Sequence, residues 1–410
     1  MRILLSVTLG ILTAIGGFLD IGDLVAAAVI GSRFGMSLAW VLVVGVTGMV
    51  LFSEMAARVT AISGRAVFDL VRERLGARAG LANLLASYII TLLTMSAQIG
   101  GIALALELAS SIHYLLWVPV AVFLVWVVIW RMPFGWMEKT YGLLGLALVV
   151  FGVALWRLGP DWGELMSSAT RFSPPPDEEW SVWSYYAIAL FGATMTPYSV
   201  LFFSSSGVEE KWTPRDLVTA RVNAFVGFPL GGLLALAIMG CAATWLMPAD
   251  IEVEDLGQVA LPVVAALGKL GLVVVIVGFF AATFGAGLES ALAAGYSVAQ
   301  YFGWPWGKTV VSPAGAPYFH VVILLSLMAG TLFILTGIDP IKVVEYSIVL
   351  SAVALPLTYL PIFVVANDRG YMGDRVNSRF TNIVGSFYLV LLLMVSIVAI
   401  PLMLYTKAGQ

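Results

Sequence analysis

Charge is scarce in this sequence. Only 11 per cent of its 410 residues are Asp, Glu, Lys or Arg and 60 per cent are hydrophobic, whereas ordinary soluble domains carry about 25 per cent charged residues. No long polar stretch separates the apolar runs. The composition therefore excludes a separate soluble domain and indicates a single membrane domain over residues 1–410.

Other absences narrow the function further. The single cysteine, Cys241, lies in an apolar run and excludes both a disulfide framework and a thiolate metal cluster. The two histidines, His113 and His320, are far apart and do not form a zinc set. No basic block indicates nucleic acid, and no glycine pattern follows a strand as nucleotide binding requires. We therefore expect neither nucleic acid nor a cofactor.

The apolar runs are long enough for eleven transmembrane helices of about 20 residues each. They are expected at residues 3–30, 36–57, 81–110, 115–130, 140–156, 183–207, 222–246, 270–302, 319–335, 343–365 and 383–404. With a cytoplasmic N-terminus, fifteen of the 21 Lys and Arg residues fall on the inner side. The positive-inside rule then predicts a multi-pass plasma-membrane protein whose C-terminus is outside.

Two carboxylates interrupt the first apolar run. Asp20 and Asp23 lie three residues apart, and Gly16, Gly17 and Gly22 around them allow the helix to open. A carboxylate near the bilayer centre costs roughly 2.5 to 3.5 kcal/mol, so a pair of them indicates a polar cavity or a bound cation. An opened helix at this depth is tolerated only where it lines a cavity. The sequence therefore predicts a binding site here.

A second interruption occurs in the run at 183–207. Pro197 removes a backbone donor, so the helix is expected to break near Thr196. Paired breaks in two halves of a chain indicate the midplane site of a transporter, where freed carbonyls coordinate a cation. We therefore assign Asp20, Asp23, Ala193 and Thr196 to one site. The breaks also predict two inverted five-helix repeats, residues 1–158 and 182–366, followed by an extra helix at 383–404.

These residues resemble the natural resistance-associated macrophage protein (Nramp) family of divalent metal transporters over most of the chain. The first-helix signature of that family is Asp-Pro-Gly-Asn, and the sixth-helix signature is Gly-Ala-Thr-x-Met-Pro-His. They correspond here to Asp20-Ile21-Gly22-Asp23 and Gly192-Ala193-Thr194-Met195-Thr196-Pro197-Tyr198. Further similar pieces are Ala56-Ala57-Arg58, Ser63-Gly64, Arg72-Glu73, Leu355-Pro356 and Met372-Gly373 with Asn377. The resemblance implies a LeuT-like fold with helices 1 and 6 broken, and a divalent metal ion as substrate.

The resemblance also implies which residues hold the ion. The family uses an Asp and an Asn of the first helix, an Ala carbonyl and a Met thioether of the sixth, which correspond by position to Asp20, Asp23, Ala193 and Thr196. Asp in place of Asn adds a negative charge, and Thr in place of Met removes the soft sulfur. Ligand softness then favours Mg²⁺, Mn²⁺ or Ca²⁺ over soft metals. The adjacent Met195 should point about 100° away along the helix and is not expected to substitute.

Proton coupling of the family type is not expected. By resemblance, the third helix should carry an Asp and a Glu that form a proton path, but Met95 and Gln98 stand at those positions. The family's His after the proline is Tyr198, which does not titrate near neutral pH. We predict that this protein either does not couple metal flux to protons in the family manner or moves protons through Asp20, Asp23 or another acid.

Two further intramembrane acids have competing interpretations. Glu289 in the eighth run is either functional or a structural hydrogen-bond partner of a neighbouring helix, and the sequence favours neither. Glu54 lies four residues before Arg58, so an ion pair along one helix is the simpler explanation. We include Gly22, Gln98, Pro197, Tyr198 and Glu289 as residues that line or gate the site.

The sequence favours a secondary transporter of a divalent metal that works by alternating access, with the lipid bilayer and the ion as partners and a monomer as functional unit. The alternative on the same fold is a carrier of a small organic cation or amino acid, with the aspartates as counter-ions and Tyr198 as a cation–π partner. An intramembrane metalloenzyme is disfavoured because no His-Glu-x-x-His helix is present. A sensor that binds metal without transporting it is a further alternative.

Overall fold

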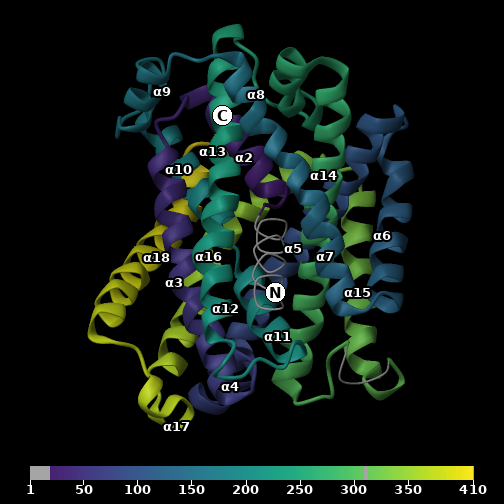
Figure 1. The fold of residues 1–410 in the computed structure, drawn as a ribbon, viewed down its shortest axis with the longest axis vertical. Helices are drawn as coiled ribbons and strands as arrows, with labels where there is room; N and C mark the ends of the chain where they lie inside the picture. Colours follow the sequence, from purple (N-terminus) through teal and green to yellow (C-terminus); the bar gives the residue numbers. More distant parts are fainter. Residues whose placement is uncertain (1–18, 309–312, 410) are drawn as a thin grey trace.

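The computed structural model describes residues 19–308 and 313–409, and these residues form helices joined by short loops, with no strand among them (Figure 1). The longer helices are α2 (Ile21–Phe34), α3 (Ala39–Ser63), α4 (Val67–Leu75), α5 (Ala77–Ser110), α6 (Tyr114–Arg131), α7 (Phe134–Gly145), α8 (Val150–Leu158), α9 (Trp162–Ala169), α10 (Trp180–Thr194), α11 (Pro197–Glu209), α13 (Phe228–Trp245), α14 (Leu256–Phe302), α15 (Pro317–Leu335), α16 (Pro340–Ala366) and α18 (Arg379–Tyr405). Short pieces include α12 (Leu217–Val222), the π-helix η2 (Asn223–Gly227), α17 (Arg369–Met372) and η5 (Gly373–Arg375).

Ten helical stretches among the described residues are long and apolar enough to cross a membrane. They correspond in order to ten of the eleven predicted spans. The remaining one is the first span, whose second half is α2. Residues 3–18 of that span, with Gly16 and Gly17, lie outside the described residues.

The helix break predicted near Thr196 is confirmed. α10 ends at Thr194, and α11 begins at Pro197, whose ring suits the first position of a helix.

One predicted boundary is displaced. α14 begins at Leu256 rather than near 270, although Gly268 interrupts it with a left-handed φ of 63°. The part of α14 after this kink matches the predicted eighth span, residues 270–302.

α5 lies in the middle of the bundle, where it packs against α14, α16, α6 and α15. Large apolar side chains on the outer helices are exposed, such as Leu270 of α14 at 80 per cent and Phe380 of α18 at 76 per cent. Such surfaces are compatible with lipid rather than water around the bundle. The buried polar side chains include Asp20 and Asp23 at the N-terminus of α2 and Thr196 at the break between α10 and α11.

Close contact between α10 and α16 depends on Gly192. A Cβ atom at this position would lie 2.3 Å from the carbonyl oxygen of Ile348, which is far inside van der Waals contact. Because the obstructing atom belongs to the backbone of α16, a side chain there cannot be accommodated by a rotamer change. Gly192 therefore sets how closely the end of α10 approaches α16.

Replacement of Gly192 by alanine is expected to push α10 away from α16 and to lower the thermal unfolding midpoint in detergent, since overpacking typically costs about 1 to 3 kcal/mol. Gly152→Ala on α8 is the matched control, because a Cβ atom there meets no atom within 4 Å. Equal midpoints for the two variants would contradict the steric role assigned to Gly192.

Candidate functional site

Two helix N-termini form the frame of the site. Asp20 is the N-cap of α2, with an extended backbone (φ −112°, ψ −178°), and Thr196 is the N-cap of α11. The positive ends of the two helix dipoles therefore lie at the start of α2 and at the break between α10 and α11. Both caps are buried, with 2 per cent of Asp20 and 5 per cent of Thr196 exposed.

Asp20 and Asp23 are joined by reciprocal hydrogen bonds. The Asp23 amide donates to Oδ1 of Asp20 at 3.1 Å, and the Asp20 amide donates to Oδ2 of Asp23 at 3.5 Å. Oδ1 of Asp23 has no hydrogen-bond partner among the described residues. Among the described residues, neither carboxylate forms an ion pair with a Lys or Arg side chain. Among the residues that the structure describes, the two buried carboxylates are thus held side by side without a basic counter-charge.

Side chains from α5 and α11 hold the start of α2. The Tyr198 hydroxyl donates to Oδ2 of Asp20 at 3.1 Å, and Oε1 of Gln98 accepts from the amide of Ile21 at 3.3 Å. Gln98 is fully buried, and its Nε2 has no partner among the described residues. Gly22 is also constrained, since a Cβ atom there would lie 2.9 Å from Oδ1 of Asp20.

The end of α10 supplies an unpaired backbone acceptor. The Ala193 carbonyl would accept from the amide of residue 197 in a continuous helix, but Pro197 has no N–H. The Thr196 hydroxyl bonds the Ser199 hydroxyl at 3.0 Å. Met195 points elsewhere, because its sulfur lies 2.8 Å from the position that a Cβ atom of Gly48 on α3 would take. Its thioether therefore packs against α3. Met195 and Thr196 both lie in the non-helical break, so the rotation along a helix on which the expectation was based does not apply here.

A cavity of about 10 Å³ lies between these elements. Asp20, Gly22, Gln98 and Thr196 of the predicted site line it, together with residues of α5 and α16. Of the other predicted residues, Asp23 and Tyr198 reach it only through their hydrogen bonds to Asp20. The cavity wall does not include Ala193, Pro197 or Glu289 of the predicted site. The lining residues are Asp20, Ile21, Gly22, Thr94, Ala97, Gln98, Thr196, Val344, Ser347, Ile348 and Ser351.

Three hydroxyl groups in the cavity wall were not predicted as site residues. Thr94 of α5 and Ser347 of α16 share a hydrogen bond of 3.0 Å. Ser351 is one turn further along α16, is 1 per cent exposed, and its Oγ has no partner in the described residues. The four-residue spacing of Ser347 and Ser351 in an apolar helix was the available signal, because it puts both on one face.

The two other acids make protein contacts. Oε1 of Glu289 accepts from the Tyr141 hydroxyl of α7 at 2.9 Å, so the helix-to-helix hydrogen bond of the structural interpretation is present. The predicted ion pair of Glu54 with Arg58 is confirmed at 3.2 Å. Within residues 19–308 and 313–409, no three His, Cys, Asp or Glu side chains come together as a metal cluster. A cation at Asp20 and Asp23 would therefore complete its shell with hydroxyl or carbonyl oxygens.

Comparison with known proteins gives a family match and several relatives. A family model described as "Natural resistance-associated macrophage protein-like" matches residues 10–401. The divalent metal cation transporter MntH of Erwinia tasmaniensis is 25 per cent identical over 389 residues, which cover 92 per cent of this chain and 89 per cent of that protein. MntH 1 of Pseudomonas aeruginosa is 26 per cent identical over 408 residues, covering 93 and 88 per cent.

Solved structures with the same fold include transporters of different substrates. The manganese transporter of Eremococcus coleocola superposes with a TM-score of 0.72 at 17 per cent identity, covering 97 per cent of this chain and 86 per cent of that one. MhsT in complex with L-phenylalanine superposes with a TM-score of 0.63 at 18 per cent identity, covering 98 per cent of each chain. At these identities the superpositions show the LeuT-like fold and leave the substrate to be argued from the site.

Proposed function

This chain belongs to the natural resistance-associated macrophage protein-like family of metal transporters, and from that premise we propose that it carries hard divalent cations, Mn²⁺ or Mg²⁺, by alternating access. It is a transporter of the multi-pass membrane class and not an enzyme. The proposed binding residues are Asp20, Asp23, the Ala193 carbonyl and Thr196. We further propose a cytoplasmic N-terminus, an external C-terminus, a plasma-membrane location and a monomeric functional unit.

The observation that carries the proposal is the pair of buried carboxylates at the helix break. Each is 2 per cent exposed, and neither is paired with a basic side chain in the described residues. Burying two negative charges at this depth is costly unless a cation compensates them. A divalent cation matches the charge of the pair, and in the family to which the chain belongs the corresponding position is a metal site.

The chemistry of the surrounding atoms favours hard ions. The available donors are carboxylate, hydroxyl and carbonyl oxygens, which suit Mg²⁺, Mn²⁺ and Ca²⁺. The thioether of Met195, the residue before Thr196, packs against Gly48. Soft ions such as Cd²⁺ therefore lose the ligand they prefer.

The small cavity bears on the choice between Mn²⁺ and Mg²⁺. A volume of about 10 Å³ is close to the minimum for one water molecule. Mg²⁺ dehydrates reluctantly and usually keeps several waters, whereas Mn²⁺ needs less room when its ligands come from the protein. In this conformation the cavity favours a largely dehydrated ion, and Mg²⁺ would require a wider state of the site.

Uptake of Mn²⁺ and Mg²⁺ into proteoliposomes that contain the purified protein tests the proposal. Saturable uptake of at least one ion is expected, with competition from the other because both use the same carboxylates. The amino acid or organic cation carrier, supported by the shared fold of MhsT, predicts uptake of an amine that metal does not inhibit. Absence of metal uptake and of mutual competition would exclude the metal proposal, and metal binding without uptake would favour the sensor.

Metal uptake is expected to proceed without acidification of the vesicle lumen. Met95 cannot titrate, and it is fully buried. Gln98 cannot titrate either, and it is held by the Ile21 amide. A lumenal pH dye recorded during Mn²⁺ uptake, with K⁺ and valinomycin to clamp the voltage, gives the measurement. Metal-driven acidification that is lost in Glu289→Gln would instead identify that acid as a proton carrier.

A further inference from the structure

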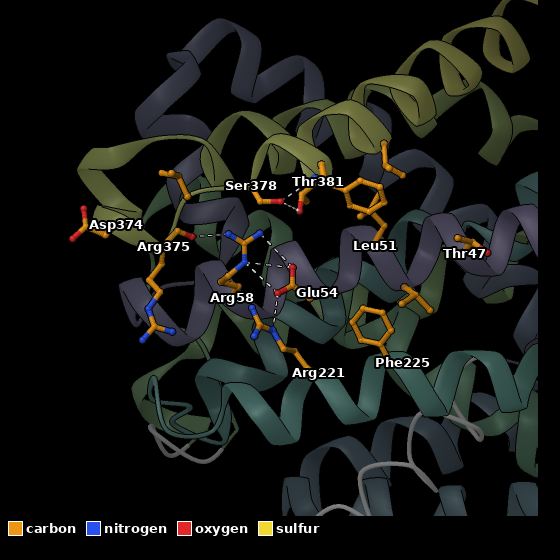
Figure 2. A pocket seen from close by; sticks show the side chains of 14 residues that line it. Thr47, Leu51, Glu54, Arg58, Arg221, Phe225, Asp374, Arg375, Ser378 and Thr381 are labelled. Atoms are coloured by element: carbon orange, nitrogen blue, oxygen red, sulfur yellow. Dashed lines mark hydrogen bonds and ion pairs between the residues drawn. The ribbon is translucent and has the colours of Figure 1, made fainter.

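A groove of about 760 Å³ lies between α3, the α12–η2 segment and the start of α18, far from the carboxylate pair (Figure 2). In Figure 1, α18 slopes away from α3 toward the end of the molecule that carries α4 and α17. The volume is typical of a site for an organic ligand rather than a gap for an ion. We call this the α3–α18 groove.

One part of the groove is apolar and belongs to the lipid-facing surface. Leu51 of α3, Phe225 of η2 and Val384 of α18 line it, and Phe225 is 59 per cent exposed. In Figure 2, Leu51 and Phe225 lie on the same side of the charged cluster. This part offers a path for an acyl chain.

The other part of the groove is basic. Glu54 accepts hydrogen bonds from two arginines, Arg58 at 3.2 Å and Arg221 at 2.9 Å, so one carboxylate serves two cations. Arg375 adds a third cation to the lining, and Asp374 lies at the outer edge in Figure 2. The cluster at Glu54, where two arginines share one carboxylate, therefore has an excess of positive charge next to the acyl path, and in Figure 2 Arg375 lies on the far side of this cluster.

The three arginines differ in how their donors are used. Arg58 is 5 per cent exposed, and besides Glu54 it donates to the Arg375 carbonyl at 2.6 Å and to Oδ1 of Asn377 at 2.5 Å. The Arg221 side chain is 48 per cent exposed, and only its Nε has a partner among the described residues. Arg221 and Arg375 thus have donors available for an anion, while Arg58 is committed to structure.

We propose that the α3–α18 groove binds an anionic phospholipid, with the phosphate at Arg221 and Arg375 and an acyl chain along Leu51, Phe225 and Val384. Basic pockets between transmembrane helices near a membrane surface are typical sites for anionic headgroups. Ser378 and Thr381 also line the groove, and because their hydroxyls bond each other at 2.8 Å, one of the two hydroxyl hydrogens is left for a headgroup. The proposal concerns a surface distant from the carboxylates and does not depend on the identity of the transported ion.

Native mass spectrometry of the detergent-purified protein, titrated with phosphatidylglycerol or phosphatidylcholine, tests the proposal. The wild type is expected to retain phosphatidylglycerol preferentially. Arg221→Gln with Arg375→Gln is expected to lose about 10-fold or more of that preference. Glu54 keeps Arg58 as its partner in this variant, so the fold should persist. Lys211→Gln with Arg215→Gln removes the same charge outside the groove and should leave the preference intact.

Two further experiments separate the alternatives. Val384→Trp should fill the apolar part and displace the lipid with every arginine present. In the wild type, photoactivatable phosphatidylglycerol should label peptides that contain Leu51, Phe225 or Val384. This experiment requires no variant. Retention of both lipids to the same extent, equal loss in the control variant, or labelling elsewhere would overturn the proposal. Displacement of the lipid by free glycerol phosphate would show that the headgroup alone is recognised and would overturn the acyl-chain assignment.

Discussion

Replacement of Asp20 by alanine is expected to abolish saturable uptake of Mn²⁺ and Mg²⁺. The change removes one of two buried carboxylates, and Asp20 is the one that lines the cavity directly. We expect metal affinity to fall at least about 100-fold, which corresponds to about 2.7 kcal/mol of binding free energy. Isothermal titration of the purified protein and proteoliposome uptake measure binding and transport separately.

The control must distinguish the charge of Asp20 from its structural role as the N-cap of α2. Asn is as good an N-cap as Asp, so Asp20→Asn should preserve the start of α2 while removing the charge. Tyr198→Phe is a second control, because it removes the hydroxyl that donates to Asp20 and keeps the carboxylate. If Asp20→Asn transports metal like the wild type, the carboxylate is a cap and the metal site lies elsewhere.

Exchange of two site residues for the family's own types, Asp23→Asn with Thr196→Met, is expected to shift selectivity toward soft metals. The double variant loses a negative charge and gains a thioether at the break between α10 and α11. We expect Cd²⁺ to compete with Mn²⁺ at least about 10-fold more strongly than in the wild type, because a thioether prefers soft ions. Uptake of labelled Mn²⁺ against increasing Cd²⁺ gives the measurement.

A second substitution at the same position isolates the sulfur. Thr196→Val removes the hydroxyl, and with it the hydrogen bond to Ser199, without adding a thioether. Combined with Asp23→Asn, it should weaken binding of hard ions and leave Cd²⁺ a poor competitor. Equal sensitivity to Cd²⁺ in the Val and Met variants would show that residue 196 does not contribute a metal ligand.

The sequence predicted the break between α10 and α11 because it has a local cause. The break in the first span stays a prediction, because residues 3–18 of that span lie outside the described residues. Pro197 cannot continue a helix, and its effect does not depend on the rest of the fold. Asp20 and Asp23 stand out because charge is so rare in this chain. The proline also identified Thr196, whereas Gln98 and Tyr198 were identified from the family resemblance. The fold places all three around Asp20.

The hydroxyl wall of the cavity was harder to predict. Serine and threonine in apolar helices often bond the carbonyl four residues earlier, as Thr91 does with Ser87, so their presence carries little signal. Thr94, Ser347 and Ser351 face one cavity only because α5 and α16 pack together. The start of α14 was missed for another reason, since Pro262, Gly268 and Lys269 interrupt the apolar stretch that begins at Leu256.

The contacts of Arg58 have a consequence for biogenesis. The Arg58 side chain belongs to α3 and is buried. Two of its acceptors, the Arg375 carbonyl and Asn377, are synthesised more than 300 residues later. Until the ribosome reaches that segment, Glu54, which also pairs with Arg221, is the acceptor that remains for Arg58 among those described. The C-terminal end of α3 can therefore reach its final state only when the chain is nearly complete. Nascent chains arrested before residue 375 should expose this arginine to membrane quality control.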